Sequence, residues 1–443
     1  MKVRLRFAPS PTGNIHIGNV RAALFNYVYA QKEKGQLILR LEDTDLERSS
    51  DESADGIIED LKWLGIQFDE GPHVGGDYGP YRQMERLTLY KKYADQLLAE
   101  GKAEKDFSHQ DEKGEIDESH YAIRFKAGGR KVRFKELVFG EVEKEVEDFI
   151  IMKSNGVPTY HLGVVVDDHL MEISHVIRGQ DHLSNTAKHV MLSEALGFDP
   201  PIYAHFSLTH GLSKRDQSKS IKALRERGYL PEAIINIAML LGWSPPDEKE
   251  KFNIFDKLSD FDPKDFTRVN ANFDEKKFNW LAGQYLREAE LDRLLALSLP
   301  YIKETGFLEE KPTDENSLKQ IIDTVRGNMK CLSEIGDHIS YFFQDLDYTD
   351  EKLQGLLKKE DSQKVFRCFI DKLNANKGLI QDSFKAILKE IQKETGVKGK
   401  NLYMPIRMAL TGQAHGPEMF MVAPILGKET CLSRLEKAVK LSE

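Results

Sequence analysis

The chain has 443 residues, 40% of them hydrophobic and 30% charged, and this composition is typical of a globular protein with about two to four domains. The net charge of -9 argues against indiscriminate nucleic-acid binding, but it does not exclude a local basic groove. The 3 cysteines are widely spaced, which favours reduced core thiols in a cytoplasmic protein over a disulfide framework. We expect no signal peptide, because no charged leader precedes an apolar run. We also expect no membrane span, because the longest apolar stretch, residues 234–243, is too short.

The first predicted strand, residues 3–7, gives way to a helix over residues 18–34. Apolar residues alternate with arginines in the strand, and two prolines and a glycine then end it. A turn between a strand and a helix N-terminus can bind an anion, because backbone N–H groups and the helix dipole point at one spot. His16 can donate a ring N–H to a phosphate there, and Gly18 lets a flat ring or a phosphate approach the backbone closely.

The next elements repeat this alternation. An apolar strand over 37–41 ends in the acidic run 42–45, and Ser49 and Ser50 can cap a helix that ends at Gly65. Alternating strands and helices predict a doubly wound parallel sheet, which binds ligands beyond the carboxyl ends of its strands. Ser10 and Glu42 fall on that rim.

A different region follows the predicted helix over 85–101. It is polar and charged, and its strand-like pieces at 121–125 and 149–152 suggest an inserted α+β subdomain. We expect the parallel pattern to resume with strands over 163–168 and 173–178, followed by a helix over 185–196. Prolines at 245 and 246 mark a boundary, and from about residue 255 the period is helical, without convincing alternating strands.

A basic loop, Gly211–Asp216, lies between two helical patterns. Taken alone, such a loop is most simply a solvated surface. The run Arg6–Asn19 (RFAPSPTGNIHIGN) nevertheless resembles the first signature of class I aminoacyl-tRNA synthetases, in the form found in glutamyl and glutaminyl enzymes. The loop GLSKRD is similar to the second signature in its glutamyl variant, KLSKR. Three further stretches are similar to the same family, at residues 177–182, 228–233 and 409–412. The resemblance therefore covers nearly the whole chain.

The resemblance implies a bacterial-type glutamate–tRNA ligase, which activates L-glutamate with ATP and transfers it to the 3′-terminal ribose of tRNA(Glu). In this family the first transfer is to the 2′-hydroxyl, and activation generally waits for tRNA. The implied domains are a Rossmann-like catalytic domain, an insert that binds the acceptor end, a helical stem-contact domain and an α-helical anticodon-binding region. Their expected bounds are 1–80 with 175–243, then 81–174, 244–300 and 301–443.

The resemblance also assigns residues. His16 and Lys214 are the expected catalytic residues, because cations and N–H donors stabilise the charge that builds on the ATP phosphates. The expected ATP contacts are His16, Gly18, Asn19, Leu212, Ser213 and Lys214. The expected glutamate contacts are Arg6, Ala8, Ser10, Glu42, Tyr160 and Arg178. Glu42 should take the ammonium and the arginines the carboxylates, although which arginine holds which carboxylate stays open.

The remaining contacts concern tRNA and metals. Candidate tRNA contacts are Arg215, Lys398, Lys400 and Arg407. Mg²⁺ is expected to arrive with ATP. Some relatives bind zinc through cysteines in the insert, but this chain has no cysteine before Cys331, and His109 and His120 cannot complete a tetrahedral site. We therefore predict no structural zinc.

The second signature departs from the family, since Gly211 stands where relatives commonly carry the first lysine. Residues 218–220 repeat a Ser-Lys-Ser pattern, but Lys214 has the right neighbours. The absence of this lysine predicts that the loop binds pyrophosphate more weakly than in relatives.

The sequence motifs leave three rival functions. Relatives that glutamylate a modified anticodon base lack the C-terminal half, and glutaminyl enzymes carry β-barrels there, so length and helical period disfavour both. A non-catalytic tRNA-binding paralogue is disfavoured by the joint presence of His16, Gly18 and Lys214. Whether tRNA(Gln) is also charged stays open, and the family suggests a monomer.

Overall fold

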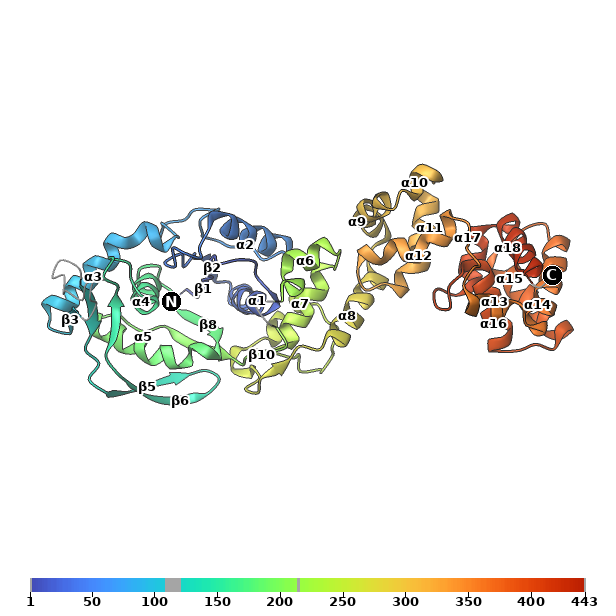
Figure 1. The fold of residues 1–443 in the computed structure, drawn as a ribbon. Helices are drawn as coiled ribbons and strands as arrows, with labels where there is room; N and C mark the ends of the chain where they lie inside the picture. The colour runs from blue at the N-terminus through green and yellow to red at the C-terminus, as the bar shows by residue number, and fades with distance from the viewer. Residues whose placement is uncertain (1, 108–120, 213–215, 442–443) are drawn as a thin grey trace. The chain divides into compact units, whose positions relative to one another are not determined.

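The structure is a computed structural model that describes residues 2–107, 121–212 and 216–441 (Figure 1). The chain forms two compact units, which are described separately. The N-terminal unit comprises Met1–Glu226 and Pro231–Phe278, and the C-terminal unit comprises Arg227–Leu230 and Asn279–Glu443. Within the described ranges, no helix combines the length and the apolar character needed to cross a membrane.

The N-terminal unit is built on parallel strands. β1 (Arg4–Phe7) leads through α1 (Ile17–Lys32) to β2 (Gln36–Leu39), and the two strands pair in parallel. β8 (His175–Gly179) lies beside β1, because the Ser174 N–H donates to the Arg4 carbonyl over 2.9 Å. Helix α5 (Leu183–Leu196) then leads to β9 (Ile202–Phe206), which pairs in parallel with β8. This arrangement confirms the predicted doubly wound class.

The ends of helix α2 (Asp51–Trp63) follow from single residues, as predicted. The Ser50 hydroxyl accepts a hydrogen bond from the Ser53 N–H over 3.1 Å at the N-terminus. At the other end Gly65 has a φ of +78°, a left-handed conformation that glycine adopts without strain.

The inserted region contains two small β-structures. A 3₁₀ turn (Gln83–Arg86) precedes α3 (Leu87–Ala99), so the predicted helix begins as a tighter turn. Strands β3 (Ala103–Asp106), β4 (Ala122–Phe125) and β7 (Phe149–Met152) form one antiparallel sheet. The hairpin of β5 (Arg130–Glu136) and β6 (Gly140–Val146) extends the parallel sheet instead, because Glu136 pairs with Tyr203 of β9.

The predicted strand over Gly163–Asp168 is wrong, because these residues lie in helix α4 (Tyr160–Leu170). Three consecutive valines suggested a strand. All residues from Leu162 to Asp168 are buried, so the helix has no polar face in this stretch that would show a period of 3.6 residues. The helix therefore brings two aspartates, Asp167 and Asp168, into the interior.

The rest of the N-terminal unit follows β9. It contains β10 (Thr209–His210), α6 (Ile221–Glu226), α7 (Pro231–Leu240) and the 3₁₀ turns Ile254–Asp260 and Pro263–Asp265. The sequence has no convincing alternating strand beyond residue 255, and β11 (Ala271–Asn272), which pairs in parallel with β10, was not predicted. A strand of two residues is too short to show alternation in sequence.

The C-terminal unit is helical in its described part, as predicted. Helix α8 (Glu275–Glu288) contains the division between the units, and the helices after it share one apolar core. They are α9 (Leu291–Glu304), α10 (Phe307–Glu310), α11 (Glu315–Val325), α12 (Ile335–Phe343), α13 (Glu351–Leu357), α14 (Glu360–Ala375), α15 (Gln381–Thr395), α16 (Lys400–Thr411), α17 (Met419–Leu426) and α18 (Lys428–Lys440). All three cysteines are free thiols. Cys331 and Cys431 are buried as expected, but Cys368 is only half-buried.

Candidate active site

A cleft of about 570 Å³ opens where strands β1, β8 and β9 end, at the rim that the parallel sheet predicts. Every described residue that the sequence assigned to ATP or glutamate lies on its wall: Arg6, Ala8, Ser10, His16, Gly18, Asn19, Glu42, Tyr160, Arg178 and Leu212. Ser213, Lys214 and Arg215 lie outside the described residues. The fold thus brings the described candidates together, while their binding roles stay predictions.

His16 and Gly18 form one unit at the N-terminus of α1. The Gly18 N–H donates to His16 Nδ1 over 3.0 Å, and Asn19 Oδ1 accepts from the His16 N–H over 3.3 Å. A Cβ atom at position 18 would lie 2.8 Å from His16 Cε1, so only glycine lets the imidazole fold back in this way. Because Nδ1 accepts a hydrogen bond, the ring proton is on Nε2, which makes that nitrogen a donor.

The segment after the second signature is tied to the first signature. The Ile221 N–H donates to the Ile15 carbonyl over 2.9 Å, and Asn14 Nδ2 donates to Gln217 Oε1 over 3.4 Å. Lys219, from the Ser-Lys-Ser repeat, donates from Nζ to the Gly211 carbonyl over 3.0 Å and to Asp216 over 3.2 Å.

Gly211 itself has a φ of +80°, a conformation in which a lysine would be strained. The glycine in place of the family's first lysine therefore fits the local backbone.

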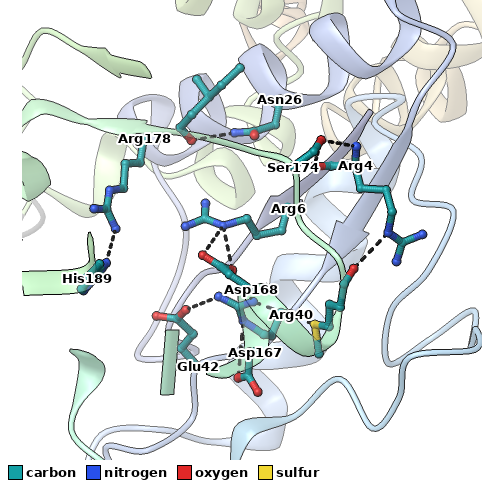
Figure 2. Close-up of polar contacts among 12 residues, drawn as sticks. Arg4, Arg6, Asn26, Arg40, Glu42, Asp167, Asp168, Ser174, Arg178 and His189 are labelled. Atoms are coloured by element: carbon teal, nitrogen blue, oxygen red, sulfur yellow. Dashed lines mark hydrogen bonds and ion pairs between the residues drawn. The ribbon is translucent and has the colours of Figure 1, made fainter. Parts of the chain in front are cut away.

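Beneath the cleft lies a buried charge cluster of three arginines and three carboxylates, and Figure 2 labels all of its members except Arg86. Asp168 joins two of the arginines, because it accepts from Arg6 Nε over 3.2 Å and from Arg40 Nη1 over 2.7 Å. Arg40 also donates to Glu42 over 3.1 Å. The positive and negative charges of the cluster are equal in number. The members of the cluster are Arg6, Arg40, Arg86, Glu42, Asp167 and Asp168.

Asp167, the other aspartate of α4, anchors the cluster to the inserted region. Its carboxylate accepts from Arg86 over 2.7 Å, from the Tyr90 hydroxyl over 2.8 Å and from Gln83 over 2.9 Å. Arg40 Nε lies 3.7 Å from it. Helix α4 therefore holds the β1 and β2 sides of the cleft against the 3₁₀ turn Gln83–Arg86 and α3.

Burial and charge act against each other in this cluster. Burial alone would lower the pKa of Arg40, but Asp168, Asp167 and Glu42 raise it above its ordinary value. Burial would raise the pKa of Asp168, yet Arg6 and Arg40 hold it below its usual range. For Glu42 burial prevails over Arg40 and Arg6, so its pKa is raised. A cation bound beside Glu42 would favour its ionised form.

Arg178, at the end of β8, has a different environment. Its guanidinium donates from Nε to His205, from Nη1 to the Tyr160 hydroxyl and His189, and from Nη2 to Thr186. These bonds use four of its five N–H donors, and every acceptor is a neutral group. Among the described residues, no carboxylate pairs with Arg178, which lines the cleft.

The histidines around Arg178 are held in the neutral form. Burial, followed by the positive charges of Lys188 and Arg178, lowers the pKa of His161 to about 4. Burial and Arg178 lower the pKa of His182 to about 4 and that of His189 well below its ordinary value. The Tyr160 hydroxyl lies 2.9 Å from His182 Nδ1, and His161 Nδ1 lies 3.2 Å from His189 Nε2. This shell directs the guanidinium without cancelling its charge.

Three of the candidate tRNA contacts lie in the C-terminal unit. Lys398, just before α16, and Lys400, its first residue, are exposed, and Arg407 is half-buried further along that helix. Arg215 lies outside the described residues, as do His109 and His120, the two histidines named in the prediction of no structural zinc. Over the described ranges, no group of three or more His, Cys, Asp or Glu side chains could hold a metal ion.

The residues that hold the two candidate arginines were not predicted from the sequence. Asp168 fell in the wrongly predicted strand, although two adjacent aspartates after an apolar run were a visible signal of a buried ion pair. Glu136 and His205, which support Arg178, gave no comparable signal, because their partners lie on distant segments of the chain.

Comparisons with known proteins agree with this geometry. Residues 2–116 and 104–280 match the family described as tRNA synthetases class I (E and Q), catalytic domain, and residues 293–439 match an anticodon binding domain. The chain is 43% identical to a glutamate–tRNA ligase of Heliobacterium modesticaldum, over 99% of this chain and 97% of that protein. It is 44% identical to a glutamate–tRNA ligase of Carboxydothermus hydrogenoformans, over 96% and 97%.

Solved structures give the same picture. A glutamate tRNA ligase from Elizabethkingia meningosepticum, in complex with its amino acid, superposes with a TM-score of 0.86 at 30% identity, covering 100% of both chains. A glutamate–tRNA synthetase from Elizabethkingia anophelis superposes with a TM-score of 0.84 at 31% identity, covering 99% of this chain and 100% of that one.

Proposed function

The chain belongs to the class I tRNA synthetases of the glutamyl and glutaminyl group, and we propose that it is a glutamate–tRNA ligase. The observation that carries this proposal is the pair of environments on the cleft wall. One arginine, Arg6, belongs to a balanced charge cluster, and the other, Arg178, meets only neutral acceptors. Such a wall suits a substrate with one ammonium and two carboxylates.

Glutamate binding follows from these charges. Glu42 takes the ammonium, whose positive charge favours the ionised state that burial disfavours. Arg6 and Arg178 take the carboxylates, with the Tyr160 hydroxyl beside Arg178 at 3.1 Å. Glutamine would leave an arginine charge under-compensated in a partly desolvated site, and the enzyme rejects it on that ground.

ATP binding follows from the first signature. The dipole at the N-terminus of α1 favours a phosphate, and His16 Nε2–H is a donor there, while the Gly18 N–H is already bonded to His16 Nδ1. The glutamate α-carboxylate attacks the α-phosphate, pyrophosphate leaves, and glutamyl-adenylate forms. The donors near the phosphates stabilise the charge that develops, and Lys214 acts with them from the second signature. Mg²⁺ enters bound to ATP.

The second step transfers the glutamyl group to the terminal ribose of tRNA(Glu). The match of residues 293–439 to an anticodon binding domain supports a role for the C-terminal unit in tRNA recognition. Lys398, Lys400 and Arg407 are proposed contacts there, because basic side chains pair with phosphates. We further propose that the enzyme acts as a cytoplasmic monomer, which light scattering of the purified protein tests.

A glutaminyl enzyme is disfavoured by the C-terminal unit, which is helical throughout its described part. The experiment is a charging assay with glutamate and glutamine on purified tRNA(Glu) and tRNA(Gln), together with ATP–pyrophosphate exchange with and without tRNA. Charging of tRNA(Glu) with glutamate is the expected result. No charging and no exchange under any condition would refute the proposal, whereas charging of both tRNAs would show a non-discriminating enzyme.

A further inference from the structure

The hydrogen bonds around Arg178 continue beyond its first partners. His205, on β9, accepts from Arg178 Nε through its Nε2 atom over 3.3 Å. On the other side of the ring, Nδ1 lies 3.2 Å from Glu136 Oε1. Both side chains are fully buried. Glu136 therefore stands one imidazole away from the guanidinium.

Glu136 is fixed by backbone groups on both of its oxygens. Oε1 also accepts from the His205 N–H over 2.5 Å, and Oε2 accepts from the N–H groups of Val138 over 2.8 Å and Phe139 over 2.5 Å. The carboxylate thus joins the turn after β5, in the inserted region, to β9 of the parallel sheet. It is an acceptor in every one of these bonds.

A neutral imidazole carries its proton on only one nitrogen, and the partner of the other nitrogen decides which. A carboxylate at Nδ1 requires Nδ1–H, which leaves a lone pair on Nε2 for Arg178. In the opposite tautomer Nε2–H could reach the Thr186 hydroxyl, 2.9 Å away, but it would face the Arg178 Nε–H, and the lone pair on Nδ1 would face the Glu136 carboxylate in a buried site. We infer that Glu136 is a positioning residue for Arg178, and that it acts by fixing the tautomer of His205.

This inference rests on the proposed function for the role of Arg178 in binding a glutamate carboxylate. A direct Arg178–Glu136 ion pair would neutralise the arginine and compete with the substrate. The imidazole between them orients the guanidinium and keeps the Glu136 oxygens occupied by other donors. The inserted region thereby takes part in amino-acid recognition through β5.

The first test is Glu136→Gln, which has nearly the same shape. The amide of the Glu136→Gln side chain can take two orientations. In the first, its NH₂ group faces the backbone N–H donors of Val138 and Phe139. In the second, its NH₂ group faces His205, whose ring can accept a hydrogen bond at Nδ1 by changing tautomer. The second orientation has fewer donor–donor conflicts and places the proton on Nε2. We expect the KM for glutamate in tRNA charging to rise about ten-fold, with the KM for ATP unchanged and kcat lowered less than about three-fold.

Two substitutions of His205 separate its contacts. In His205→Asn the amide occupies the place of Nδ1, which keeps the bond to Glu136 and loses the acceptor for Arg178. In His205→Gln the amide oxygen reaches the place of Nε2, which keeps the acceptor. We expect His205→Asn to raise the KM for glutamate about ten-fold and His205→Gln to raise it less. Adding Glu136→Gln to His205→Asn should change this KM less than two-fold, because Glu136 acts through the ring.

A readout independent of activity is the ¹⁵N NMR spectrum of protein labelled at histidine, in which His205→Asn identifies the His205 signals. The expected result is Nδ1–H in the wild type and Nε2–H in Glu136→Gln. Glu145→Gln, an exposed carboxylate on β6, is the matched control and should change neither the tautomer nor the KM.

The outcomes separate the two proposals. If the wild type charges glutamate but Glu136→Gln leaves its KM unchanged, or if the double variant shows fully additive effects, the inference is overturned while the function stands. If Glu136→Gln does not fold, two other results decide. The inference is overturned by an Nε2–H tautomer of His205 in the wild type, and equally by the same rise in the KM for glutamate in His205→Asn and His205→Gln. If the wild type charges no tRNA, the proposed function fails, and the NMR result still decides the tautomer.

Discussion

Replacing Asp168 by asparagine tests the charge balance beneath the cleft. The carboxylate is 7% exposed and bonds to Arg6 and Arg40, so the amide keeps its shape but removes one of the three negative charges of the buried charge cluster. Removing one partner of a buried ion pair costs about 3–5 kcal/mol. Because Glu42 and Asp167 still lie near Arg40, we expect the free energy of unfolding to fall by about 3 kcal/mol, the lower end of this range.

The assay must report on the N-terminal unit alone. Of the 3 tryptophans, Trp63 and Trp243 lie in this unit and Trp280 lies in the other. In a Trp280→Phe background, tryptophan fluorescence during urea unfolding therefore follows the unit that contains Asp168. The control is Asp95→Asn, which breaks an exposed pair with Lys91 and should cost less than about 1 kcal/mol.

The pH dependence gives the sign of the effect. Arg6 and Arg40 hold the pKa of Asp168 below its ordinary value, so the folded state binds this proton less tightly than the unfolded state. Its stabilisation is fully present above the unfolded pKa of about 3.9 and is lost as the pH falls through the lower folded value. The free energy of unfolding of the wild type should exceed that of Asp168→Asn by a constant amount from about pH 7 to pH 5. Below about pH 4 this difference should be smaller. A difference at pH 7 no larger than that of Asp95→Asn, or an equal difference at pH 3, would refute the reasoning.

Three further substitutions probe the cleft wall. Gly18→Ala places a methyl group 2.8 Å from the His16 ring and should lower kcat/KM for ATP about 10²-fold with little change in Tm; an unchanged rate would contradict the assigned role of His16. Lys219→Met removes the bonds to Gly211 and Asp216 and should raise the KM for ATP a few-fold, while Lys222→Met, an exposed control, should not. Tyr160→Phe leaves an Arg178 donor without its acceptor and should raise the KM for glutamate roughly five-fold in charging assays; a change in the KM for ATP alone would contradict this.

The cleft wall could be predicted because it depends on local patterns. The strand at 3–7, its breaking prolines and the helix after Gly18 are adjacent in sequence, and parallel strands end at one edge of a sheet. Ser10 and Glu42 therefore fell at the right place without knowledge of their partners. The Ser50 cap and Gly65 were predictable for the same reason, since each acts within a few residues.

Helix α4 could not be predicted, because both signals for its structure fail there. Its valines favour a strand, and its burial on all sides removes the helical period. The error hid Asp168, whose partners Arg6 and Arg40 are more than a hundred residues away in the chain. Long-range ion pairs of this kind depend on the packing of elements, which a single sequence does not reveal.

The two candidate arginines show what the structure adds to specificity. Both line the cleft, and residue type alone could not rank them. Arg6 shares Asp168 with Arg40, whereas the acceptors of Arg178 come from three separate elements and are all neutral. Neutral acceptors fix the directions of the N–H groups but leave the positive charge for a ligand. At a separation of about 4 Å and an effective dielectric constant near 20, that charge attracts a carboxylate by about 4 kcal/mol, before desolvation is subtracted. A neutral amide forgoes this attraction, so a carboxylate in place of His189 would remove the basis for choosing glutamate.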